Sequence, residues 1–152
     1  MLEYSREILL DDIKGLDQGD LDYIAYEGAN SIGALLVHIV AIEFVHQVIT
    51  FEKRDLNETE LAYWESALFL GEKAKEAIKN KPIEYYVNLL SETRETTLAL
   101  LRSQKEEWLF EEHKWENGVT HNYYWLWYHV MEDEVNHRGQ IRMIKKMLFN
   151  TP

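Results

Sequence analysis

Proline interrupts this 152-residue sequence at only one internal position, Pro82, apart from the final residue. Because proline breaks helices and seldom enters central strands, its scarcity leaves long segments in which a regular helix is possible. Within these segments, apolar residues recur at the three- and four-residue steps of an amphipathic helix. The sequence therefore predicts an all-α fold.

The length fits a single domain spanning residues 1–152, and 46% of the residues are hydrophobic, enough for a sizeable core. Cysteine is absent, so disulfides and thiolate metal ligands are excluded. We find no secretory signal and no run of about 18 charge-poor apolar residues, and we expect a cytoplasmic protein without a membrane partner. The net charge of −11 repels phosphate backbones, so nucleic acid is not an expected partner.

Periodicity predicts five helical segments, over about 1–13, 32–49, 58–78, 82–103 and 121–148. The second is apolar on most sides and should run through the centre of a bundle. Between the first two helices we expect a polar connection. Before the last helix the pattern breaks around Asn117-Gly118, which favours a tight turn and a short hairpin.

Side chains that accept backbone N–H bonds mark the expected helix starts. Asn30 or Ser31 should cap the central helix, and Asn57 with Glu60 three residues later resembles a capping box. Thr120 is the expected cap of the last helix.

Two potential metal ligands lie on the apolar face of the last predicted helix. Asp133 and His137 are four residues apart, so both side chains project from one side and can reach a single ion. A buried carboxylate and imidazole need partners. The same face carries Leu126, Val130, Ile141, Ile144 and Leu148.

His38 is the best candidate for a third ligand, because it lies in the most apolar segment and Ala34 and Ala41 leave space beside its ring. Two imidazoles and a carboxylate suit Zn²⁺, Ni²⁺ or Fe²⁺ rather than Ca²⁺, and leave positions for water or substrate. Such an ion would make a bound water or thiol more acidic.

Other interpretations of these polar residues stay open. In one of them, His38 and His137 are core histidines that are hydrogen-bonded to carbonyls or carboxylates, and Asp133 simply pairs with His137 or Arg138. His129 is a fourth ligand, a partner of a ligand, or a surface residue.

The remaining histidines and the aromatic residues carry less specific expectations. His46 is expected on a helix face, and His113 and His121 are expected in solvent. The aromatic run at 123–128 favours core and subunit packing, with a substrate pocket as the alternative.

Two sequence blocks, SIGALLVHI at 31–39 and EVNHRGQ at 134–140, resemble the DinB/YfiT-like superfamily of metal-binding proteins. The resemblance implies an antiparallel four-helix bundle with an additional short helix or crossover, and a divalent-metal site at His38, Asp133 and His137. In the family pattern a histidine usually stands at position 133. Gln140 would orient a ligand, and Gly139 would permit close helix packing.

The resemblance also implies an activity. Members include S-transferases that use a low-molecular-weight thiol such as bacillithiol or mycothiol, which here would attack an electrophilic substrate held over the aromatic residues. The alternatives are a non-catalytic, dimeric metal-binding or stress-associated bundle, and a metal-free structural bundle. We expect a homodimer.

Overall fold

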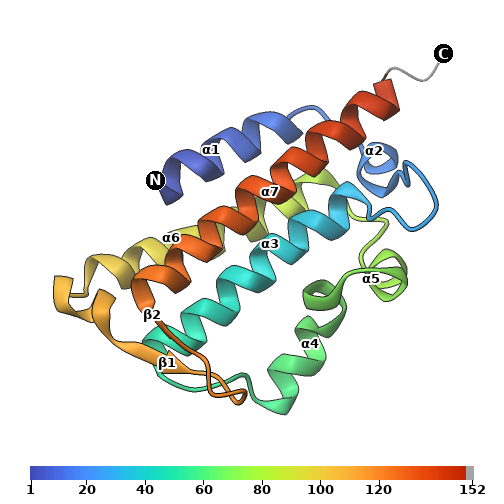
Figure 1. The fold of residues 1–152 in the computed structure, drawn as a ribbon. Helices are drawn as coiled ribbons and strands as arrows, with labels where there is room; N and C mark the ends of the chain where they lie inside the picture. Colours follow the sequence, from blue (N-terminus) through green and yellow to red (C-terminus); the bar gives the residue numbers. More distant parts are fainter. Residues whose placement is uncertain (150–152) are drawn as a thin grey trace.

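The computed structural model describes residues 1–149 and consists of four long helices joined by shorter elements (Figure 1). Helix α3 packs against α6 and α7, and α1 packs against the same two helices. α3 and α7 run in opposite directions (Figure 1). The predicted helical bundle is confirmed. Its long helices are α1 (Leu2–Ile13), α3 (Ile32–Gln47), α6 (Ile83–Arg102) and α7 (Tyr123–Phe149).

A crossover connects α3 to α6, which run in the same direction, and it contains α4 (Glu58–Phe69) and α5 (Glu72–Ala77) (Figure 1). The sequence predicts one helix over this region, and that prediction is wrong. Leu70 and Gly71 have φ angles of 54° and 76°. A right-handed helix cannot continue through residues with positive φ, so the chain bends there.

Helix α3 supplies the centre of the core and continues into a π-helix at Val48–Glu52. The combined segment Ile32–Glu52 is long and apolar enough to cross a membrane by composition alone. This corrects the prediction that no segment reaches that length. However, 78% of the segment's most apolar window is buried inside the bundle, as expected for the core helix of a helical bundle.

Shorter elements fill the two predicted irregular regions. α2 (Gln18–Asp22) lies in the connection after α1, and a 3₁₀-helix (Glu106–Phe110) follows α6. The predicted hairpin is present, with β1 (Glu112–Lys114) antiparallel to β2 (Thr120–Asn122).

The capping predictions hold at two of three helices. The Ser31 hydroxyl accepts a hydrogen bond from the backbone N–H of Ala34 in the first turn of α3, and Asn57 and Glu60 form a reciprocal capping box at α4. The prediction for Thr120 is wrong, because this residue belongs to β2. The side chain of Asn122 instead accepts an N–H bond from the first turn of α7.

A buried ionic network, which the sequence analysis missed, joins the four long helices. Each helix contributes one residue, and each of these residues is at most 3% exposed: Arg6, Glu43, Arg94 and Glu134. Nη2 of Arg6 lies 2.7 Å from Glu43 and 2.9 Å from Glu134, and Arg94 contacts the same two carboxylates at 2.7 and 2.6 Å. Two positive and two negative charges therefore compensate one another inside the bundle.

Candidate metal centre

His38, Asp133 and His137 come together where α3 packs against α7. The Nε2 atoms of His38 and His137 lie 3.6 and 3.3 Å from Oδ1 of Asp133. Each residue offers one ligand atom, and these atoms all lie within 4.8 Å of one another. The ring centroids of the two histidines are 4.6 Å apart, with one ring edge-on to the other. The structure thus brings together all three residues that the sequence analysis selected.

The crossover fixes the orientation of His38. Its Nδ1 donates a hydrogen bond of 2.8 Å to the carbonyl oxygen of Ala67 in α4. Because Nδ1 carries that proton, Nε2 of the neutral ring presents a lone pair toward Asp133. Metal-binding histidines commonly hold their second nitrogen in this way, which sets both the tautomer and the ring direction.

The remaining polar atoms of the centre show that its donors fit a cation. Oδ2 of Asp133 is buried and has no hydrogen-bond partner among residues 1–149, and the same is true of Nδ1 of His137. A buried carboxylate oxygen without a partner is unfavourable, and a cation would satisfy it. Two imidazole nitrogens and one carboxylate suit a divalent first-row transition metal.

Charge at the centre favours an ionised carboxylate. Burial opposes ionisation of Asp133, but hydrogen bonds and charge interactions with His137 and His38 outweigh it and hold its pKa below the usual range. Burial likewise opposes protonation of His38, yet Asp133 and the Ala67 carbonyl raise its pKa above the ordinary 6.5. The same contacts therefore stabilise negative charge on Asp133 and positive charge on His38.

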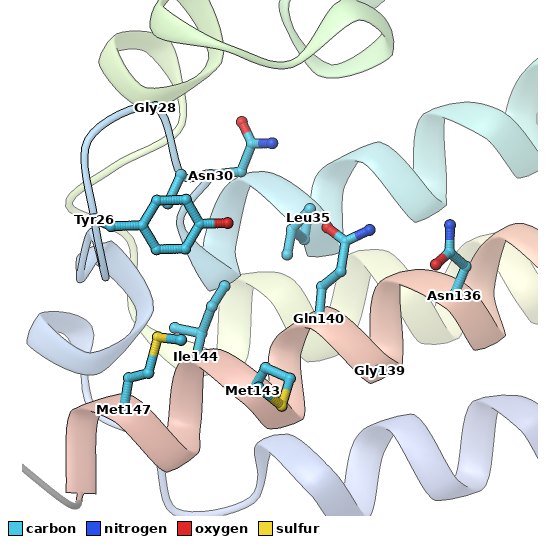
Figure 2. Close-up of a pocket in the computed structure, with 11 residues that line it drawn as sticks. Tyr26, Gly28, Asn30, Leu35, Asn136, Gly139, Gln140, Met143, Ile144 and Met147 are labelled. Carbon is cyan, nitrogen blue, oxygen red and sulfur yellow. The ribbon is translucent and has the colours of Figure 1, made fainter.

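A cavity of about 460 Å³ is lined by residues of α7, by Leu35 of α3 and by the loop before α3, which includes Tyr26 and Asn30 (Figure 2). Leu35 lies one turn before His38, and Asn136 and Gln140 flank His137. No charged side chain is among the lining residues in the described part of the chain. The cavity therefore offers amide groups and thioethers to a ligand, and His38, Asp133 and His137 are not among its described lining residues.

Gly139 lines this cavity, which overturns the prediction that it permits close helix packing. A Cβ atom at Gly139 would meet nothing within 4 Å. The close approach occurs instead at Gly33, where a Cβ would lie 2.6 Å from the hydroxyl oxygen of Tyr86. Gly33 therefore permits α3 to pack against α6.

A sequence model of the mycothiol S-transferase family matches residues 1–148. The chain belongs to this family. The family is part of the DinB/YfiT-like superfamily, so the resemblance noted in the sequence is confirmed. The comparison with curated protein sequences found no match.

Solved structures similar to this mycothiol S-transferase family member include two bacterial proteins. A conserved protein from Enterococcus faecalis is 18% identical with a TM-score of 0.73, and the match covers 99% of this chain and 94% of that one. A protein from Streptococcus pneumoniae is also 18% identical with a TM-score of 0.71, covering 96% and 87%. At this identity the similarity shows the fold alone.

In this family member, His46 and His129 form a second imidazole pair near the centre. His46, which was expected on a helix face, lies on the inward face of α3 and is only 4% exposed. Its ring centroid lies 5.8 Å from that of His129, whose side chain is 39% exposed. The structure does not place His129 in the three-residue cluster found within residues 1–149.

The histidines of the hairpin contact tryptophan side chains and are not fully exposed to solvent. Nδ1 of His121 accepts a 2.9 Å hydrogen bond from Trp115, and its ring stacks on Trp125 at 3.8 Å. Trp125 also stacks with His129 at 5.3 Å. His113 packs edge-on against Trp115. The prediction that His113 and His121 are solvated is therefore wrong.

The aromatic run of this family member divides between core and surface. Tyr123 and Trp127 are buried, as the packing interpretation expects. Tyr124, Trp125 and Tyr128 are 60%, 39% and 48% exposed, so they remain available to a ligand or a second subunit.

Proposed function

We propose that the protein is a divalent-metal-dependent S-transferase that acts on a low-molecular-weight thiol. The observation that carries this proposal is the approach of two imidazole Nε2 atoms to one largely buried carboxylate, in a chain of the mycothiol S-transferase family. His38, Asp133 and His137 would hold the ion. A divalent ion there would supply Lewis acidity that lowers the pKa of a thiol reaching the site.

The transfer joins sulfur to an electrophilic carbon. The thiol loses its proton, the sulfur forms a bond to the carbon, and the bond from that carbon to its leaving group breaks with both electrons. The products are a thioether and the leaving group, and the proton from the thiol passes to solvent. The bond from His38 to Ala67 and the ionised state of Asp133 preorganise the site, so little rearrangement accompanies the reaction.

The adjoining cavity supports an uncharged thiol. Its amide groups, which include those of Asn136 and Gln140, can hydrogen-bond hydroxyl and amide groups of a ligand. The described lining carries no cation to pair with carboxylates. We therefore expect mycothiol-like neutral thiols to react faster than thiols bearing carboxylates, for which glutathione is the contrasting probe.

The test combines metal content with thiol turnover in protein purified without a histidine tag. The parent should contain at least about one equivalent of zinc, nickel or iron per chain. It should also consume thiol with monochlorobimane as the electrophile. His137→Ala should lose thiol turnover and about one equivalent of metal, while His121→Ala, which alters a histidine outside the centre, should keep both. Equal rates for the parent and His137→Ala would reject the proposed role. A parent that neither contains nor binds metal would support the metal-free structural bundle.

A non-catalytic, dimeric metal-binding protein is the second candidate, and an exposed apolar surface favours it. Residues from α1, α6 and α7 line an apolar cavity of about 190 Å³, close to Tyr124 and Tyr128. We infer that a second copy covers this surface. Sedimentation should detect a dimer that Tyr128→Glu dissociates, and metal binding without thiol turnover would favour this candidate over the transferase.

We also infer a cytoplasmic location. The proposed chemistry needs a reduced thiol, and the sequence contains no cysteine that depends on an oxidising compartment.

A further inference from the structure

We propose that Asp133 bridges two metal ions, and that His46 and His129 are ligands of the second. The second ion would be a divalent first-row transition metal, as for the first site. This inference rests on the proposed function only through the first ion, which His38 and His137 would hold on the other side of the carboxylate.

The two imidazole pairs occupy successive levels of the interface between α3 and α7. His46 lies two turns after His38, whereas His129 lies two turns before His137. Because the helices are antiparallel, both displacements point the same way along the bundle (Figure 1). Asp133 is midway in sequence between the two histidines of α7, and its charge acts on the ring of His46 as well as on His38 and His137.

The spacing of the second pair fits a shared ion. The ring centroids of His46 and His129 are 5.8 Å apart. Two imidazoles that bind one ion through bonds of about 2.1 Å have centroids roughly 5 to 6 Å apart. The Nδ1 of His129 also faces Glu132 at 3.5 Å, which leaves its Nε2 for a ligand.

His46 has the tautomer and protonation state of a metal ligand. Its Nδ1 donates a 2.7 Å hydrogen bond to the carbonyl oxygen of Ile42, so Nε2 carries the lone pair. That Nε2 is buried and has no hydrogen-bond partner within the part of the chain that the structure describes. Burial lowers the pKa of His46 to about 4, so the ring is neutral at pH 7. An unpaired lone pair in the core is unfavourable, and an ion would satisfy it.

Asp133 supplies the remaining donor. Oδ1 faces the imidazoles of His38 and His137, and Oδ2 is the oxygen left without a partner in residues 1–149. A carboxylate can bind a separate ion with each oxygen, whereas a histidine at this position would offer a single lone pair. The net charge of −11 also favours a second cation.

The test is the number of Zn²⁺ ions bound in equilibrium dialysis, which needs no activity. We expect two equivalents for the parent and for the control His121→Ala. We expect one for His46→Ala, His129→Ala and Asp133→His, because the last variant keeps three donors for the first ion but no bridge. His129 is partly exposed, so its replacement should leave folding intact, and circular dichroism checks this for each variant.

The outcomes separate this inference from the proposed function. One equivalent in the parent, lost in His38→Ala, would overturn the second site and leave the transferase proposal standing. No bound Zn²⁺ would overturn both. Two equivalents retained in both His46→Ala and His129→Ala would overturn these residues as ligands, and two retained in Asp133→His would overturn the bridge.

Discussion

Asp133 and Glu134 are neighbours in α7, but their carboxylates have separate partners. Oε2 of Glu134 lies 2.6 Å from Nη2 of Arg94 and 2.9 Å from Nη2 of Arg6, whereas Oδ1 of Asp133 faces the two imidazoles of the candidate centre. Successive residues of a helix point about 100° apart, which separates the two environments. Because both guanidinium groups are engaged by Glu43 and Glu134, the charge of Asp133 stays available to a cation.

Arg94→Leu should destabilise the fold strongly. Glu43 and Glu134 would lose one of their two guanidinium partners in a site where both carboxylates are fully buried. Breaking a buried ion pair from one side costs about 3–5 kcal/mol of unfolding free energy. Urea denaturation measures the loss. Arg102→Leu is the control, because the ion pair of Arg102 with Glu3 is exposed, and its effect should be small.

His46 should make the metal-free protein sensitive to mild acid. Its folded-state pKa of about 4 lies below the ordinary 6.5, so the unfolded chain binds a proton that the folded chain does not. The contribution of the neutral ring to stability is complete above pH 6.5 and is lost as the pH falls toward 4. This difference in pKa corresponds to roughly 3 kcal/mol.

Urea unfolding at pH 7 and pH 4.5 checks this expectation. Between these values the parent should lose more stability than His46→Gln, because the glutamine at position 46 does not titrate. Both proteins share every other titratable group, so protonation of carboxylates cancels in the comparison. Equal losses would show that the buried ring does not cause the acid sensitivity.

Gly139→Leu should weaken substrate binding without removing the metal. The new side chain would enter the cavity beside His137, where a Cβ meets nothing within 4 Å. If the cavity holds the thiol or electrophile, KM should rise about tenfold or more while metal content stays constant. Val135→Leu is the control, because Val135 is an exposed residue of α7 that does not line the cavity. An unchanged KM for Gly139→Leu would place the substrate elsewhere.

Alanine at two glycines should have opposite effects on stability. At Gly33 the added methyl group would clash with Tyr86, which is fully buried and cannot move aside freely, so we expect a loss of about 1–3 kcal/mol. At Gly139 the methyl group would have space, and alanine should stabilise the helix by about 0.5–1 kcal/mol. Thermal unfolding of the two variants measures the contrast, and a stable Gly33→Ala would disprove the tight contact.

The sequence indicates the candidate site because the features that mark it lie within single helices. Asp133 and His137 share a helix face, and His38 is a polar residue in an apolar helix, so the spacing and the local composition together select all three. The network of Arg6, Glu43, Arg94 and Glu134 was missed because each residue comes from a different helix, and no local spacing shows which charges meet.

Two other differences also arise because a local sequence pattern carries too little information. Leucine rarely adopts positive φ, so nothing at Leu70 indicates that a helix ends there. The burial of His46 was missed because it depends on how α7 lies across α3, which the pattern of either helix alone does not define.

If an ion occupies the candidate centre, the hydrogen bond from His38 to Ala67 would couple its release to local opening of the crossover. When α4 detaches locally, the imidazole loses the acceptor that fixes its tautomer and is free to rotate away from Asp133. An ion that binds only the closed form lowers the population of this opened form by mass action. The rate at which such an ion exchanges with solvent would then depend on local opening of Glu58–Phe69, without separation of the four long helices.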